Sequence, residues 1–143
     1  MQRIGLFGGS FNPIHNGHLH LAQTARESLG LDQVVLIPAN VSPFKQQNPD
    51  MASGADRLAM CRLAAETLPF CTVDGCELER AGVSYTVDTV RLFRNRYPEA
   101  ELLAGDSGNG STGRGVSHRR GHGGTGGTES IFIAIWQNFF VSR

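Results

Sequence analysis

Residues 8–18 read "GGSFNPIHNGH", and this stretch joins the first two predicted elements of the chain. The apolar run "RIGLF" at 3–7 precedes it and ends at two glycines, which predicts a short buried strand. After His18, apolar residues recur at helical spacing as far as Gly30, which predicts a helix that ends at this glycine. His15 and His18 are therefore predicted to lie at the junction of a strand and a helix.

The following residues repeat this alternation. Residues 33–38, "QVVLIP", are a second buried strand, and after a polar loop Ser53 is placed to cap a second helix whose apolar residues reach Leu68. Residues 70–80, from "FCTVD" to "CELER", are expected to form a third strand, and 84–98 a third helix. The regular order predicts an α/β fold, a parallel sheet with crossover helices. Such sheets bind ligands at the carboxyl ends of their strands, so the histidine stretch is the candidate site.

Composition limits the classes of function. The chain has 143 residues, which suits one domain, and 13 lysines and arginines balance 13 aspartates and glutamates. This balance gives no reason to expect binding to nucleic acid or to an anionic membrane. Cys61, Cys71 and Cys76 are odd in number and form no C-x-x-C pair, so we expect buried free thiols rather than disulfides or a zinc ribbon. With no signal peptide and no bilayer-spanning run, we expect a cytoplasmic protein.

The residue types in the histidine stretch suit phosphate chemistry. Glycines after a strand let the backbone approach a phosphate, and a helix that starts near Gly17 adds free N–H groups and a positive dipole end. His15 and His18 can each donate a hydrogen bond to a phosphate oxygen, which stabilises negative charge on a phosphorus centre. A glycine-rich turn without a ligand is one alternative, and a metal held by the histidines is another. We predict no metal, because no Cys or carboxylate pair supplies further ligands.

Three stretches carry a family resemblance. "GGSFNPIHNGH" resembles the G-x-F-x-P-x-H-x-G-H signature of the nucleotidylyltransferase superfamily. "IPANVSPFK" at 37–45 resembles the "IP…PPHK" loop of bacterial nicotinate-nucleotide adenylyltransferases, and "ELERAGVSYTVDTVRLFRNRYP" at 77–98 resembles their E…R…SYT-x-DT segment. The likeness covers residues 1 to about 104, in the same order and with similar gaps.

The resemblance implies a Rossmann-like domain over residues 1–104 that transfers AMP from ATP to nicotinate mononucleotide. The products would be deamido-NAD and pyrophosphate, in the biosynthesis of NAD. The 5′-phosphate of the mononucleotide would attack the α-phosphorus of ATP in line, and Mg²⁺ would accompany the triphosphate. The implied partners are these two nucleotides, with no nucleic acid and no membrane. The oligomeric state stays open.

The resemblance also implies site residues. His15 and His18 match the catalytic histidines that contact the ATP phosphates. The loop whose backbone lies along ATP matches Gly8, Gly9, Ser10 and Phe11. The positions that read the nicotinate nucleotide match Asn40, Lys45, Tyr85 and Thr86. For Tyr85 and Thr86 a plain helix start is the alternative interpretation, and for Lys45 a solvated loop charge.

The carboxyl-terminal part departs from the family. Residues 105–128 contain ten glycines, with Val116 as the single aliphatic residue, and we expect this segment to be disordered. Residues 129–143 are apolar again, of doubtful structure, with a strand as one reading. The family's G-x-D turn and late "S-S-T-x-I-R" helix start are missing, and Asn12 stands where its members more often have aspartate. We therefore expect a truncated or disrupted sheet on this side, and weak or absent activity.

Other functions stay open on the sequence alone. The chain could transfer AMP to nicotinamide mononucleotide or to phosphopantetheine, or transfer a cytidylyl group. An alternative from a different class of function is a remnant that binds nucleotides without catalysis. A structural or interaction module has little support outside the tail.

The abrupt change of composition after Leu103 predicts a shifted reading frame in the gene. Translation of the two other frames downstream of this codon should then restore a Ser-Thr-Ile-Arg motif. Sequencing the DNA around codons 100–110 checks this. If neither frame contains the motif, the hypothesis of a frameshift is wrong.

Overall fold

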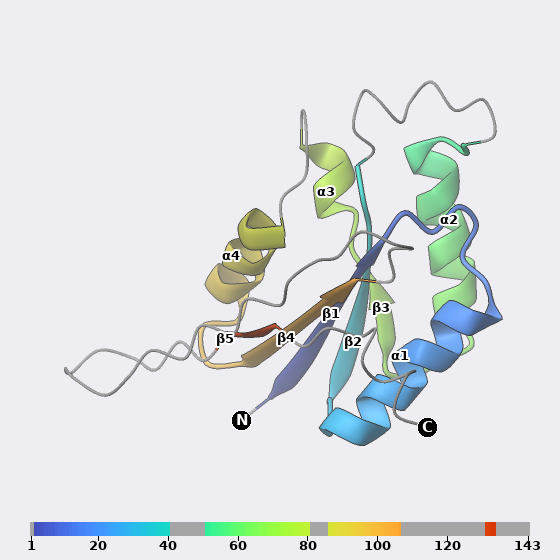
Figure 1. The fold of residues 1–143 in the computed structure, drawn as a ribbon. Helices are drawn as coiled ribbons and strands as arrows, with labels where there is room; N and C mark the ends of the chain where they lie inside the picture. Colours follow the sequence, from blue (N-terminus) through green and yellow to red (C-terminus); the bar gives the residue numbers. More distant parts are fainter. Residues whose placement is uncertain (1, 41–50, 81–85, 107–130, 134–143) are drawn as a thin grey trace.

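The computed structural model describes residues 2–40, 51–80, 86–106 and 131–133. Its strands form one parallel sheet in the order β3-β2-β1-β4-β5, with helices on both faces (Figure 1). The elements in chain order are β1 Arg3–Gly9, α1 Asn16–Leu29, β2 Gln33–Pro38, α2 Gly54–Ala65, β3 Cys71–Val73, α3 Cys76–Glu79, α4 Thr86–Arg96, β4 Glu101–Asp106 and β5 Ile131–Ile133. The predicted parallel sheet with crossover helices is confirmed.

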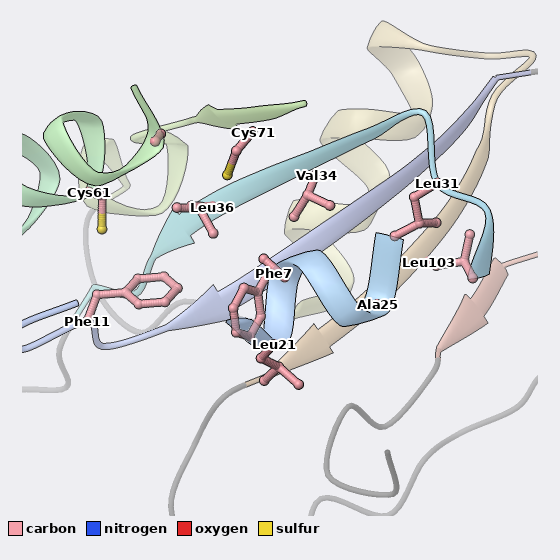
Figure 2. Packing of buried hydrophobic residues seen from close by; sticks show 12 residues of the cluster. Phe7, Phe11, Leu21, Ala25, Leu31, Val34, Leu36, Cys61, Cys71 and Leu103 are labelled. Atoms are coloured by element: carbon pink, nitrogen blue, oxygen red, sulfur yellow. The ribbon is translucent and has the colours of Figure 1, made fainter. Parts of the chain in front are cut away.

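Side chains on each central strand alternate between two cores, one on each face of the sheet. On β2, Val34 and Leu36 pack with α1 and α2, whereas Val35 and Ile37 pack with α3 and α4. Figure 2 shows the first of these cores, with Phe7 of β1 between the sheet and α1. Because both faces are covered, the central strands read as continuous apolar runs in the sequence.

Strand order reverses at β1. The chain adds β2 and β3 on one side of β1, then returns to place β4 on the other side. Gly8 thus lies between Ile37 of β2 and Asp106 of β4. A reversal of this kind leaves a crevice at the carboxyl ends of the strands, where open α/β sheets bind ligands.

Helix boundaries follow local signals. Gly30 ends α1 in the left-handed conformation at φ 62°, and its N–H donates to the carbonyl of Arg26, as the sequence predicted. The Oγ of Ser53 accepts from the N–H of Asp56 and caps α2. Helix α2 ends at Ala65, so Leu68 packs against the core from the turn after the helix rather than from within it.

The prediction of one strand over residues 70–80 is wrong. The structure has β3 at Cys71–Val73, followed by the short helix α3 at Cys76–Glu79. The cause is local, because the Asp74 carboxylate accepts from the N–H of Cys76 at 2.9 Å, which favours a turn between β3 and α3.

The carboxyl-terminal boundary also differs from the expected one. Strand β4 continues through Gly105 and Asp106, which pair with Phe7 and Gly8, so the first two residues of the predicted disordered segment are strand. Within the apolar segment 129–143, residues Ile131–Ile133 form β5 and pair in parallel with β4. The expected disorder of the intervening glycine-rich residues, 107–128, falls outside the described part of the chain. Across the described residues, no helix has the length and apolar character to span a membrane.

Two leucines test the core. Leu36 is fully buried in β2 and Leu63 is 65% exposed on α2. Leu36→Ala should lower the free energy of unfolding by about 2–5 kcal/mol, through lost burial and a residual cavity, whereas Leu63→Ala should change it by less than about 0.5 kcal/mol. Urea denaturation followed by circular dichroism measures both. Equal losses in the two variants would contradict this placement of β2.

Candidate functional site

The two histidines cap helix α1 reciprocally. His15 is the N-cap residue, and its Nδ1 accepts from the N–H of Gly17 at 3.1 Å. The Nδ1 of His18 accepts in turn from the N–H of His15, also at 3.1 Å. This is the geometry of a capping box, built here from imidazoles instead of a hydroxyl and a carboxylate. Since both Nδ1 atoms accept, each neutral ring carries its proton on Nε2, where it remains a donor.

The pair is packed tightly against the core on one side. The His15 and His18 rings lie 3.8 Å apart between centroids and are tilted by 34°. His15 is exposed, whereas His18 is half-buried, and the ring centroids of His18 and Phe11 lie 5.1 Å apart in a T-shaped arrangement. Burial, and secondarily the neighbouring His15, lowers the pKa of His18 to about 4. His18 is therefore neutral near pH 7.

Gly17 is required by this arrangement. A Cβ at this position would lie 2.8 Å from Cε1 and 2.9 Å from Nδ1 of His15. Any larger residue would push the imidazole out of its capping position. Steric contact with His15 thus explains why a glycine stands between the two histidines.

At the end of β1 the residues that a ligand could reach offer mainly backbone groups. Gly8 and Gly9 are the last residues of the strand, and the carbonyl of Gly9 accepts from the N–H of Ala39 at 2.8 Å. Phe11 adopts φ 47° in the left-handed region, and its side chain is 1% exposed and points into the core (Figure 2). If Phe11 contacts ATP, as the resemblance implies, only its backbone can do so. Ser10 is exposed beside it.

Asn40 follows β2 and starts a polar chain that the sequence did not predict. Its Nδ2 donates to the carbonyl of Arg80 at 2.9 Å. The Nη1 of Arg80 donates to Oγ1 of Thr89 at 3.0 Å, and this hydroxyl donates to Oε1 of Glu77 at 2.7 Å. Glu77 and Thr89 are buried, so this end of the chain is shielded from water, whereas Asn40 and Arg80 are partly exposed. The E…R…DT spacing of residues 77–89 contains the polar residues of this chain, but the sequence alone did not link them to Asn40.

The remaining predicted positions are only partly visible. Lys45 and Tyr85 lie outside the described residues. Thr86 begins α4, and its side chain is not among those described. The structure therefore brings Gly8, Gly9, Ser10, Phe11, His15 and His18 to one sheet edge, and places Asn40 at the end of the neighbouring strand.

A cavity of about 570 Å³ lies between the start of α2 and α3. Among the described residues, Asn40 is the predicted site residue that lines it. The lining residues are Asn40, Met51, Ala52, Ser53, Gly54, Ala55, Arg57, Leu58, Gly75, Leu78 and Glu79. Within the described ranges, no three His, Cys, Asp or Glu residues are grouped so that they could hold a metal ion.

Arg57 is the site residue that sequence reasoning missed most clearly. Its side chain is 2% exposed, and it donates three hydrogen bonds to backbone carbonyls. One sequence signal could have found it, since Arg57 is four residues before Cys61 and eight before Ala65, on the buried stripe of α2. A charged residue on an apolar stripe calls for a specific partner.

Asn12 also gains a role. Its Oδ1 accepts from the N–H of Ala52 at 2.9 Å. An aspartate oxygen could accept the same bond, so the exchange of aspartate for asparagine at this position keeps the contact.

Comparison with known proteins agrees with this geometry. The chain is 50% identical over 103 residues to the "Probable nicotinate-nucleotide adenylyltransferase" of Neisseria meningitidis serogroup C, which covers 71% of this chain and 51% of the relative. A relative of the same name from Herpetosiphon aurantiacus is 48% identical over 101 residues, covering 71% of this chain and 50% of its own length. The chain thus spans about half the length of the curated relatives it matches. The predicted resemblance is confirmed.

Solved structures show the same fold. The nicotinic acid mononucleotide adenylyltransferase of Plasmodium falciparum, complexed with NaAD, superposes with a TM-score of 0.59 at 14% identity, over 73% of this chain and 51% of that chain. At this identity the likeness concerns the fold alone. The sequence profile described as Cytidylyltransferase-like matches residues 6–109, most of the chain. With its two histidines at the switch point of a parallel sheet, the chain belongs to the cytidylyltransferase-like family.

Proposed function

We propose that this site transfers AMP from ATP to nicotinate mononucleotide, giving deamido-NAD and pyrophosphate in NAD biosynthesis. The observation that carries the proposal is the histidine pair, which presents two Nε2–H donors at the start of α1. Relatives that are 50% and 48% identical carry the name of this activity, which supports the choice of acceptor. The proposed enzyme is a nucleotidyltransferase.

The reaction needs charge stabilisation more than covalent chemistry. An oxygen of the mononucleotide's 5′-phosphate attacks the α-phosphorus of ATP, a new P–O bond forms, and the bond to the β-phosphate oxygen breaks as pyrophosphate leaves. In this proposal His15 and His18 donate to the oxygens on which charge grows, and the start of α1 adds its N–H groups. Gly8, Gly9, Ser10 and Phe11 line ATP through their backbone, which holds it in line with the acceptor.

The acceptor would bind beside the neighbouring strand. We assign it to Asn40, Lys45, Tyr85 and Thr86, of which Asn40 is held by the Arg80 carbonyl in the structure. ATP enters as its magnesium complex, in which phosphate oxygens hold the ion as part of the substrate. The partners are then small molecules, without nucleic acid or membrane. A cytoplasmic location is supported by three buried cysteines that are all free thiols.

An acceptor panel tests the assignment of substrate. Any dinucleotide that forms with ATP, which we expect at a low rate, should come only from nicotinate mononucleotide; mass spectrometry together with pyrophosphate release detects it. Nicotinamide mononucleotide and phosphopantetheine, or CTP in place of ATP, should give little product. A preference for any of these would reassign the activity within the family.

Histidine variants test the donors. His15→Asn keeps an oxygen that can cap α1 but removes the ring donor, and His18→Ala removes the second donor. Each should lower kcat on the order of a hundredfold, as loss of one preorganised donor does. His20→Asn, on an exposed position of the same helix, is the matched control and should leave kcat unchanged. Calorimetry with ATP accompanies the assay, and each ring loss should weaken affinity roughly tenfold. Unchanged affinity and rate in the ring variants would contradict the proposal.

The pH response of His18 gives a second check. In the free protein its ring should titrate near pH 4, and bound ATP should raise this pKa, because phosphate oxygens stabilise the imidazolium. The unfolded chain takes up this proton near pH 6.5 and the folded chain only near pH 4, so acid lowers the free energy of unfolding between these values. Histidine NMR spectra with and without ATP measure both pKa values. A His18 ring that titrates identically in both samples would speak against phosphate binding.

A further inference from the structure

We propose that Arg57 is a positioning residue that orients two peptide groups, Ser10–Phe11 and Ala39–Asn40, so that their N–H groups face the two nucleotides. The inference deepens the proposed function and rests on it. Arg57 itself is not assigned a contact with either substrate. It acts from beneath the loops at the carboxyl ends of β1 and β2.

The contacts of the guanidinium are specific. Nη1 donates to the carbonyl of Ser10 at 2.8 Å and to that of Ala39 at 2.9 Å, so one nitrogen joins the loops that follow two neighbouring strands. Nε donates to the carbonyl of Ala52 at 3.2 Å, which ties the same group to the segment before α2. The planar fork of arginine can hold three carbonyls in one arrangement, whereas a lysine ammonium has no fixed fork.

Peptide geometry turns this clamp into an orientation of donors. In a trans peptide the carbonyl of one residue and the N–H of the next point in opposite directions. The one cis bond found in the described residues is Asn12–Pro13, so both clamped peptides are trans. With the Ser10 and Ala39 carbonyls directed at Arg57, the N–H groups of Phe11 and Asn40 point away from it. These residues are the ones assigned to ATP and to the acceptor.

Neighbouring bonds fix the spacing of the same loops. The N–H of Ala39 donates to the carbonyl of Gly9 at 2.8 Å, and the N–H of Ala52 donates to Oδ1 of Asn12 at 2.9 Å. The backbone from 9 to 12 is thus held on both sides, with Arg57 between the two contacts. A change at Arg57 should therefore alter both nucleotide subsites together.

A role of Arg57 in stability alone explains its contacts with three carbonyls less well. Among the described residues, the ion pairs are Arg3–Glu101 and Arg96–Asp74, and neither involves Arg57. A cation buried against carbonyls, with no carboxylate partner in the part of the chain that the structure describes, is a costly way to fill an apolar stripe, because burial disfavours its charge. Burial accordingly lowers the pKa of Arg57. A positive charge below the loops also favours the approach of phosphates.

Arg57→Lys tests the clamp, since it keeps the charge and loses the fork. It should lower kcat/KM roughly ten- to a hundredfold for both ATP and nicotinate mononucleotide, the loss expected when a donor to a charged oxygen is misplaced. Arg62→Lys, the same exchange on an exposed position of α2, is the matched control and should behave as wild type. Thermal unfolding of both variants is measured in parallel, so that kcat/KM is compared only between folded proteins.

Amide NMR of the wild-type chain provides a measurement that needs no variant. ATP should shift the Phe11 amide and the acceptor should shift the Asn40 amide, while the amide of Ala22 in the core stays in place. In Arg57→Lys these shifts should be reduced. If calorimetry shows that ATP binds but the Phe11 and Asn40 amides do not respond, or if Arg57→Lys retains wild-type kcat/KM, this inference is wrong and the proposed function stands. If wild type neither binds ATP nor forms product, both fail.

Discussion

Strand β1 hydrogen-bonds to β2 along one edge and to β4 along the other, and the geometry of the site depends on this central position. A strand buried on both faces cannot shift without exposing one of its cores, so its carboxyl end is a fixed point. Gly8 and Gly9 end the strand there, and α1 begins seven residues later. The residues that we assign to phosphate binding lie at or directly after this end of β1.

The histidines cap α1 through one ring nitrogen each, and in the proposed function they bind phosphate through the other. Their Nδ1 atoms complete the start of α1, which leaves the Nε2–H groups as donors without a further cost in ordering. The same packing that orients His18 also lowers its pKa to about 4, so the ring is neutral near pH 7. A neutral donor can bind phosphate and gain strength as negative charge develops. In our proposal Arg57 complements the pair, because it orients the neighbouring peptide groups through the Ser10 and Ala39 carbonyls.

Local signals explain which predictions succeeded. The Ser53 cap, the Gly30 stop and the apolar run of β2 depend on residues close in sequence, and the structure has all three. The error over residues 70–80 came from Asp74, whose carboxylate accepts a backbone N–H and converts an apparent strand into a strand and a helix. A side chain that competes for the backbone in this way is hard to distinguish from a polar residue on a strand.

The sequence by itself determined the alternation of strands and helices, the glycines that the backbone requires, and the histidine pair with its resemblance to adenylyltransferases. Tertiary structure alone decided the position of β1 between β2 and β4, the clamp of Arg57 on Ser10 and Ala39, and the polar chain from Asn40 to Glu77. The physical reason is the separation of the contacting residues along the chain. Capping and periodicity act within a few residues, whereas Arg57 contacts residues 18 and 47 positions away and Asn40 contacts a residue 40 positions away.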